Sequence, residues 1–435
     1  MDQRTMVSTL AGAAGKEVTL YGWVDVVRDQ KAVQFIVLRD ESGKVQLVND
    51  RDASAGIAET IAGLTLDSTV RAIGTVELND RVKLGGLEVR LASLEVLSSA
   101  APALPLNAES ALDTRLDWRF VDLRRPENRL IFEIQTAVEQ SFRRTWQADG
   151  FLELHSPKLM AGASESGAEL FRVDYFDTSA YLAQSPQFYK QMAMAAGFGR
   201  VFEIGPVFRA NPSFTSRHDT EFTSVDVEIS WVESHEDVMA FEERLVANML
   251  ADVSGVFGER IRETFGTEVR VPTVPFPRIS LADALQAIRA RGYEVRREAG
   301  DLDPEGERQL AAYIQETAGH EFVFVTDYPV SVRPFYHMRQ AGNPELTKSF
   351  DLLWKGLEIT TGAQREHRPE QLVSQVREKG IPEEGLAYYL DFFRYGCPPH
   401  GGFGLGLTRV LMILLGMANV REVTFLYRGP NRLFP

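Results

Sequence analysis

The chain has 435 residues, and this length predicts about three structural units and allows a large buried core. Hydrophobic residues make up 44% of the chain and charged residues 25%, and no apolar run approaches the ~20 residues of a membrane-spanning helix, so a membrane protein and a disordered chain are excluded. The 47 Lys and Arg against 61 Asp and Glu give a net charge of −14, so any nucleic acid must be bound by local patches.

The single cysteine, Cys397, cannot form an internal disulfide, and the N-terminal segment has no basic stretch followed by an apolar core. We therefore expect a cytoplasmic protein. The seven histidines do not follow any spacing typical of zinc ligands, so a structural metal is not expected.

Residues 1–104 predict a small β-barrel. Apolar and polar side chains alternate over residues 18–26, which is the period of a half-buried strand. Similar runs follow at residues 34–40, 44–50, 68–78 and 87–97. Five short strands favour the five-stranded oligonucleotide-binding (OB) barrel, with a small sandwich as the alternative.

An Ala-, Ser- and Pro-rich stretch at residues 98–110 shows no hydrophobic period and indicates a domain boundary. We place a hinge at residues 105–128 and a second domain at residues 129–435. Its patterns predict strands and helices in an irregular order, which indicates an α+β fold on a largely antiparallel sheet. The strands are expected at 151–157, 200–209, 223–230, 321–329 and 356–360, and the helices at 129–149, 235–253, 282–291, 305–318, 369–379, 382–394 and 407–418.

The last glycine cluster, GGFGLGLTR at residues 401–409, leads into an apolar helix. A dinucleotide-binding loop belongs near the start of a strand–helix–strand unit, so that interpretation is rejected. Glycines here would let a base or phosphate approach the backbone, and Arg409 at the helix start would face it. A tight packing turn is the alternative.

Residues 202–230 predict two strands joined by a polar loop. Arg209 ends the first strand, Arg217 and His218 lie in the loop, and Phe222 begins the return strand. Such cations hold phosphate oxygens, and an aromatic face stacks a purine. An exposed basic hairpin is the alternative.

The segment SFDLLWKGLEITTGAQREH, residues 349–367, carries Asp351, Glu358 and Thr361. Carboxylate and hydroxyl oxygens are the ligands that Mg²⁺ prefers, especially when substrate phosphates complete its shell. Arg365 is equally explained as an ion-pair partner of these acidic groups.

Taken together, these segments resemble the class II aminoacyl-tRNA synthetases. The strand ended by Pro157 resembles motif one, the FRx hairpin with RHxxEF motif two, and the glycine run ending in Arg409 motif three. The segments QSPQFYKQ, GLEITTGAQR and PPHGG narrow the resemblance to the aspartyl-tRNA synthetases. It covers nearly the whole chain, and the absence of a large insertion between motifs two and three resembles the compact archaeal and eukaryotic type.

This resemblance implies an ATP-dependent aspartate–tRNA ligase that forms an aspartyl-adenylate. Arg209 would bind the α-phosphate, Phe222 would stack on adenine, and Arg217 and His218 would hold the outer phosphates. Arg409 would pack against the adenine. Asn211 stands where the family usually has Glu, and Thr408 where motif three often has Glu, and neither departure removes a phosphate-binding arginine.

The resemblance also assigns the remaining groups of the site. Asp351, Glu358 and Thr361 fall at magnesium contacts, and Glu358 joins Arg209 and Arg409 in the catalytic set. Arg365 and Lys190 would contact the side chain of aspartate, with Asp226 and Gln187 beside them. His400 would close the pocket. Glu165 or else Glu169 would meet the ammonium group of the substrate.

In the barrel, the resemblance assigns the anticodon contacts to Arg28, Phe35 and Gln46. The partners would be tRNA(Asp) and a second copy of the chain, since motif one builds the homodimer in this class. Asp25 stands where strict enzymes of the compact type tend to carry Trp, which favours relaxed selection that includes tRNA(Asn).

The sequence disfavours two other functions. An asparaginyl-tRNA synthetase is disfavoured by Lys190 in the QSPQFYK segment. A nucleic-acid-binding or regulatory protein that has lost catalysis is disfavoured because Arg209, Glu358, Arg365 and Arg409 are all present.

Overall fold

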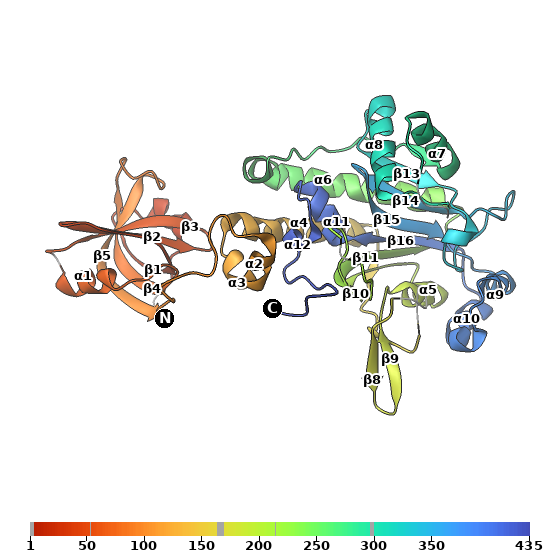
Figure 1. Cartoon of the computed structure of the whole chain (residues 1–435), viewed down its shortest axis with the longest axis horizontal. Helices are drawn as coiled ribbons and strands as arrows, with labels where there is room; N and C mark the ends of the chain where they lie inside the picture. Colours follow the sequence, from red (N-terminus) through yellow and green to blue (C-terminus); the bar gives the residue numbers. More distant parts are fainter. Residues whose placement is uncertain (1–3, 53, 163–168, 214, 296–299) are drawn as a thin grey trace. The chain divides into compact units, whose positions relative to one another are not determined.

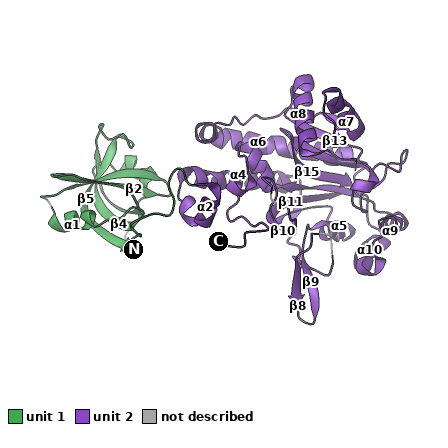
Figure 2. Cartoon of the chain, viewed as in Figure 1, with its two compact units in different colours: residues 1–110 green, residues 111–435 purple. Residues whose placement is uncertain are grey.

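The computed structural model describes residues 4–52, 54–162, 169–213, 215–295 and 300–435. The chain divides into two compact units, Met1–Ser110 and Ala111–Pro435 (Figure 2). The division falls inside the stretch assigned to the hinge from the sequence. Residues 112–122 of that stretch form two short helices of the second unit. The domain limits given from the sequence stay a prediction.

The first unit is a closed five-stranded barrel in the order β1-β2-β3-β5-β4 (Figure 1). Alternating side chains such as Leu20, Ile36 and Leu47 fill its interior, so the OB-type barrel is confirmed and the sandwich alternative is wrong. Its elements are η1 (Val7–Ala13), β1 (Glu17–Asp29), β2 (Val33–Asp40), β3 (Gly43–Asp50), α1 (Ala55–Ala62), β4 (Thr69–Leu78) and β5 (Leu87–Ser98).

The second unit is built on an eight-stranded, mostly antiparallel sheet in the order β12-β13-β14-β15-β16-β11-β10-β6. A separate three-stranded sheet has the order β7-β9-β8. The strands are β6 (Leu152–Glu153), β7 (Leu159–Met160), β8 (Arg172–Tyr175), β9 (Thr178–Leu182), β10 (Arg200–Phe208), β11 (Glu221–Ser230), β12 (Arg278–Ser280), β13 (Phe322–Thr326), β14 (Ser349–Trp354), β15 (Leu357–Gln364) and β16 (His400–Gly406).

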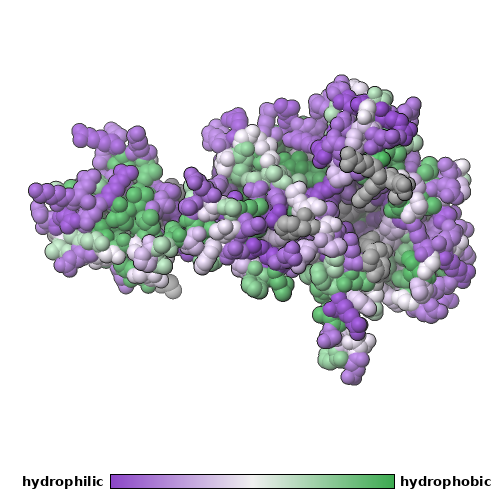
Figure 3. All heavy atoms as spheres, viewed as in Figure 1, coloured by the Kyte–Doolittle hydropathy of each residue, from purple (hydrophilic) through white to green (hydrophobic). Residues whose placement is uncertain are grey.

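Helices surround this sheet, and Figure 3 shows mainly hydrophilic residues over α7, α8 and α9 on the visible face of the second unit. The helices are α2 (Leu112–Asp117), α3 (Arg119–Asp122), α4 (Pro126–Ala148), α5 (Gln187–Ala195), α6 (His235–Phe265), α7 (Leu281–Ala290), α8 (Pro304–Ala318), η2 (Val330–Val332), α9 (Pro369–Glu378), η3 (Glu383–Leu386), α10 (Ala387–Arg394), α11 (Leu407–Leu414) and α12 (Val420–Val423). Among the described residues, no helix is both long and apolar enough to cross a membrane.

The two faces of the large sheet have different chemistry. On β11, Val225 and Val227 enter a core shared with α4 and α6, where they meet residues such as Ile134 and Leu245. Because side chains alternate along a strand, the intervening polar side chains of β11 point to the opposite face. That face carries the candidate site.

Several elements differ from the prediction. The strand expected at 151–157 is reduced to β6, which pairs in parallel with β10, and the helix expected to end near residue 253 continues to Phe265. Helix α5 and the three-stranded sheet were not predicted. The glycine cluster contains a strand, β16, between β11 and β15; a Cβ on Gly402 would come 2.0 Å from the Val227 carbonyl oxygen, so glycine is required by this close approach.

Candidate active site

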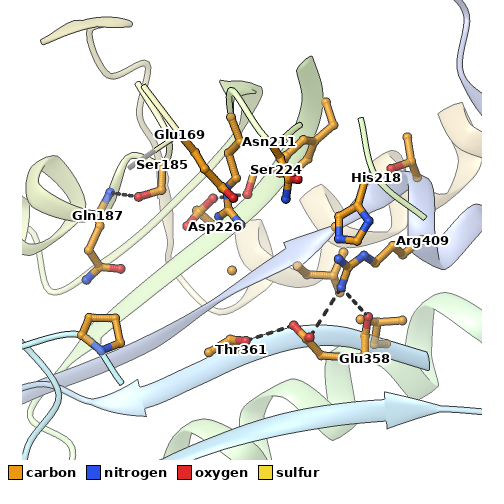
Figure 4. A pocket seen from close by; sticks show the side chains of 18 of the residues that line it. Glu169, Ser185, Gln187, Asn211, His218, Ser224, Asp226, Glu358, Thr361 and Arg409 are labelled. Atoms are coloured by element: carbon orange, nitrogen blue, oxygen red, sulfur yellow. Dashed lines mark hydrogen bonds and ion pairs between the residues drawn. The ribbon is translucent and has the colours of Figure 1, made fainter. Parts of the chain in front are cut away.

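A pocket of about 320 Å³ opens over the polar face of the sheet. Strands β11, β15 and β16 form its floor, and the helix starts of α5 and α11 contribute to its wall. Figure 4 shows Glu358, His218 and Arg409 together at one end, and Asp226, Ser224 and Glu169 further along it. The site residues predicted from motifs two and three therefore meet in one cavity.

The phosphate-binding candidates lie where β10, β11 and α11 converge. Arg209 follows β10, and its Cζ lies 5.5 Å from the ring centroid of Phe222 on β11. Arg409 donates from Nη1 to the carbonyl oxygen of Glu358 at 2.9 Å and lies 3.6 Å from the carboxylate. A fixed cation beside an aromatic face is suited to a nucleotide.

Arg217 lines the same pocket but is paired with an acid that the sequence did not identify. Its Nη1 lies 2.8 Å from Oε2 of Glu307 on α8. Burial raises the pKa of Glu307 to about 7, with Arg217 opposing the rise. Burial together with Arg409 and Arg217 lowers the pKa of His218. The cations at this end are therefore partly compensated by one buried carboxylate.

The magnesium candidates are shared between this pocket and a neighbouring cavity. Thr361 donates to Glu358 at 3.1 Å on β15, and Asp351 lies directly opposite Thr361 on β14. Oδ2 of Asp351 accepts from Arg333 at 2.7 Å, whereas Oδ1 is buried and meets no hydrogen-bond partner among the described residues. Burial raises the pKa of Asp351 to about 6 against the opposing charge of Arg333.

These oxygens fit the ligand preference of magnesium. Among the residues that the structure describes, however, no three His, Cys, Asp or Glu side chains gather as a metal site. A magnesium ion at Asp351 and Glu358 would therefore need phosphate oxygens or water to complete its shell.

At the other end of the pocket, four charged side chains form a buried cluster, which we call the charge cluster: Lys190, Asp226, Glu228 and Arg365. Lys190 Nζ lies 2.9 Å from Asp226 and 3.4 Å from Glu228. Arg365 donates to Glu228 from Nε at 3.1 Å and from Nη2 at 3.4 Å. All four residues are at most 4% exposed.

The charge cluster is balanced within the chain itself. The two carboxylates of Asp226 and Glu228 compensate the charges of Lys190 and Arg365, so the ion-pair alternative given for Arg365 applies, with Glu228 as its partner. Lys190 also donates to the carbonyl oxygen of Phe403 at 3.0 Å. The charge of the cluster alone therefore does not explain a preference for an acidic ligand. The orientation of the N–H donors of Lys190 and Arg365 matters as well.

The other predicted substrate contacts lie in different places. Gln187 begins α5, lines the pocket and donates to Gln191 at 2.9 Å. His400 is fully buried behind the pocket, with Nε2 3.0 Å from Gln191 and Nδ1 2.8 Å from the Pro398 carbonyl oxygen. It is not among the residues that line the pocket, because its ring nitrogens face Gln191 and Pro398. Glu165 lies outside the described residues, whereas Glu169 lines the pocket.

The three anticodon candidates share the outer face of the barrel. Arg28 on β1 lies opposite Phe35 on β2, and Gln46 on β3 is opposite Val37, two residues further along β2. Gln46 donates to Glu88 at 2.8 Å. The three side chains thus form one continuous surface across neighbouring strands.

Several pocket residues were missed from the sequence. Ser224 lines the pocket and Glu228 belongs to the charge cluster; they stand two residues on either side of Asp226, so strand periodicity alone places them on the same face. Arg333, Tyr336 and His337 lie in an irregular segment that carries no periodic signal.

Known protein families match the two units of the chain separately. The family model described as tRNA synthetases class II (D, K and N) matches residues 111–428, and the model described as OB-fold nucleic acid binding domain matches residues 18–97. The aspartate–tRNA(Asp/Asn) ligase of Aeropyrum pernix is 44% identical over 440 residues, covering 99% of this chain and 98% of that protein. The aspartate–tRNA(Asp) ligase of Pyrococcus abyssi is 42% identical over 97% of both chains.

Solved structures with the same fold include both amino-acid specificities. The asparaginyl-tRNA synthetase of Pyrococcus horikoshii, complexed with asparaginyl-adenylate, is similar with a TM-score of 0.92 and 31% identity over the whole of both chains. The aspartyl-tRNA synthetase of Entamoeba histolytica has a TM-score of 0.88 and 31% identity, covering 100% of this chain and 93% of that one.

Proposed function

The chain belongs to the class II tRNA synthetases of the D, K and N group, and from this membership we infer that it is an ATP-dependent aspartate–tRNA ligase. The assignment of the site rests on one observation: two sets of residues meet in the same pocket. Arg209, Phe222 and Arg409 suit a nucleotide, and the adjoining charge cluster suits an amino acid with a short acidic side chain.

The first step joins the α-carboxylate of aspartate to the α-phosphorus of ATP, and the bond from that phosphorus to pyrophosphate breaks. A carboxylate is already deprotonated at neutral pH, so the step needs no general base. We assign Arg209 to the α-phosphate, where its donors stabilise the charge that develops in the transition state. In the second step, a hydroxyl of the terminal ribose of tRNA attacks the aspartyl carbonyl, and AMP leaves.

We also propose that Asp351, Glu358 and Thr361 hold magnesium. The unpaired buried oxygen of Asp351 supports this proposal, because an isolated buried carboxylate oxygen is unfavourable unless a ligand meets it. When bound, magnesium would supply positive charge to the phosphate oxygens. Arg409 and Glu358 remain the residues that set the position of the nucleotide at this end.

Asparagine is the second candidate substrate, since asparaginyl-tRNA synthetases share this fold. Lys190 favours aspartate, because the QSPQFYK segment that carries it resembles the aspartyl-tRNA synthetases. The relatives with over 40% identity that carry the name aspartate–tRNA ligase support the same choice.

We propose that both tRNA(Asp) and tRNA(Asn) are charged. The names of the Aeropyrum pernix and Methanopyrus kandleri relatives include both tRNAs, and here Asp25 pairs with Arg39 and Lys44 on the outer face of the barrel. A homodimer and a cytoplasmic location complete the proposal. Leu152 and Leu159, both 48% exposed in the motif-one segment, are suited to burial against a second copy.

The test is aminoacylation of purified tRNA(Asp) and tRNA(Asn), each with labelled aspartate or labelled asparagine. We expect aspartate to be attached to both tRNAs and asparagine to neither. Attachment of asparagine would replace the proposal with the second candidate, and failure with tRNA(Asn) alone would restrict it to tRNA(Asp). Absence of charging with either amino acid would favour a protein that has lost catalysis.

A further inference from the structure

We propose that His337 is a positioning residue that fixes the guanidinium of Arg365 in the orientation needed to recognise the side-chain carboxylate of the substrate. The inference rests on the proposed function of the pocket, where Arg365 contacts aspartate. His337 lines the pocket and is only 2% exposed.

The guanidinium of Arg365 is held from two directions. On one side, Glu228 accepts from Nε and Nη2. On the other side, Nη1 lies 3.0 Å from Nε2 of His337. The ring of Tyr336 lies 5.6 Å from Cζ and adds a contact with the guanidinium face. Glu228 holds the edge formed by Nε and Nη2, and His337 adds an anchoring bond at Nη1.

The chemistry of arginine determines the state of the histidine. A guanidinium has only donors, so Nε2 of His337 must accept and the ring must be neutral with its proton on Nδ1. Burial, together with Arg365, Arg333 and Lys190, keeps the pKa of His337 well below its usual value. His337 therefore acts as a neutral acceptor and adds no positive charge to the charge cluster.

The backbone around His337 is itself fixed. His337 forms an isolated bridge with Arg365, and the neighbouring Met338 donates to the Gln364 carbonyl oxygen at 3.0 Å. From α9, the buried amide of Gln375 donates to the carbonyl oxygens of Phe335 and His337. The acceptor at Nε2 is thus carried on a segment tied to the end of β15 and to Arg365, which follows that strand.

The other ring nitrogen argues against a purely structural role. Nδ1 is buried and finds no hydrogen-bond partner among the described residues. A buried N–H without a partner destabilises the fold, and an apolar side chain of similar size would avoid this cost. Among the described residues, the bond from Nε2 to Arg365 is the polar side-chain contact that explains a histidine at this position.

Orientation matters because the charge cluster is already neutral before substrate binds. Bidentate recognition of a carboxylate depends on the direction of two N–H groups as well as on charge. A small tilt of the guanidinium would weaken that recognition while leaving the distant nucleotide contacts unchanged.

The test compares His337→Leu, which removes the acceptor, with His337→Gln, which keeps a neutral oxygen acceptor on a side chain of similar reach. KM for aspartate, KM for ATP and kcat are measured by pyrophosphate exchange, with the thermal midpoint as a check of folding. Loss of a hydrogen bond to a charged group should raise KM for aspartate by about 10-fold or more in the leucine variant. KM for ATP should stay within about twofold, and the glutamine variant should recover most of the loss.

The control is His320→Leu, which replaces a histidine bound to the carbonyl oxygens of Phe322 and Thr273, away from the pocket. It should leave KM for aspartate unchanged. If His337→Leu does not fold, His337→Met replaces it with the same expectation.

An unchanged KM for aspartate in the leucine variant, or an equal rise for aspartate and ATP, would overturn the inference while leaving the proposed function intact. Failure of glutamine to recover aspartate binding would also overturn it, since the acceptor would then not be the relevant property. Absence of aspartate-dependent exchange in the wild-type chain would instead reject the proposed function.

Discussion

Replacing Arg365 by leucine removes two interactions of this residue, one with the substrate and one with Glu228. Arg365 is assigned to the substrate carboxylate, and it also neutralises Glu228, which is 0% exposed. After Arg365→Leu, the only cation of the cluster near Glu228 is Lys190, at 3.4 Å, and Asp226 shares it at 2.9 Å. The variant should therefore lose both substrate affinity and stability.

The two losses have different sizes. A hydrogen-bonded contact to a charged group is worth about 1.5–3 kcal/mol, so KM for aspartate should rise by about 10- to 150-fold, with KM for ATP nearly unchanged. Leaving a buried carboxylate without its partner costs about 3–5 kcal/mol of unfolding free energy. Urea denaturation measures the second effect, and pyrophosphate exchange measures the first.

A double variant distinguishes them. Adding Glu228→Gln to Arg365→Leu removes the uncompensated carboxylate and leaves Lys190 paired with Asp226. We expect most of the lost stability to return and the high KM for aspartate to remain. Recovery of aspartate affinity in the double variant would refute the assignment, since Arg365 would then act only as a counterion of Glu228. Equal increases in KM for aspartate and ATP in the single variant would contradict it as well.

Three further predictions concern other parts of the chain. Arg209→Ala should lower the rate of aspartate-dependent exchange by about 10²- to 10³-fold with an unchanged thermal midpoint, and near-normal exchange would remove Arg209 from the α-phosphate. Phe35→Ala should weaken charging of tRNA by the loss of a stacking contact of about 1–3 kcal/mol while exchange without tRNA stays normal; a parallel loss of both would argue against an anticodon role. Glu242 on α6 is fully buried, and burial raises its pKa from 4.5 to about 8. Since the folded chain keeps this proton up to pH of about 8 and the unfolded chain releases it near pH 4.5, stability should fall as pH rises through that window. The contribution is about 1.4 kcal/mol per pH unit, and Glu242→Gln should remove it from urea denaturation curves recorded in magnesium-free buffer; an unchanged slope would show that Glu242 is ionised in the fold.

The barrel could be predicted because its strands alternate inward and outward side chains. Ile36 and Leu47 point inward, and Phe35 and Gln46 point outward, as the period of two requires. Glycine-rich β16 could not be recognised as a strand from propensity, since glycine is depleted in strands. Its formation depends on the close approach of Val227, a contact between distant segments.

Part of the candidate site could also be predicted from the sequence. Arg209 and Arg409 were singled out by their places at a strand end and a helix start, and the resemblance assigned their roles, whereas Glu228 could have been found from its spacing to Asp226 on one strand. Glu307 and His337 lie far from their partners in sequence, in elements whose pattern does not show which side chain meets an arginine. The sequence therefore indicates the cations of the pocket, and the structure shows how each is compensated.

The central claim is that this pocket activates aspartate with ATP. Its most direct test is exchange of labelled pyrophosphate into ATP by the purified wild-type chain, without tRNA, in the presence of aspartate or asparagine. We predict exchange that depends on aspartate and is absent with asparagine. Exchange with asparagine alone, or with neither amino acid, would contradict the claim.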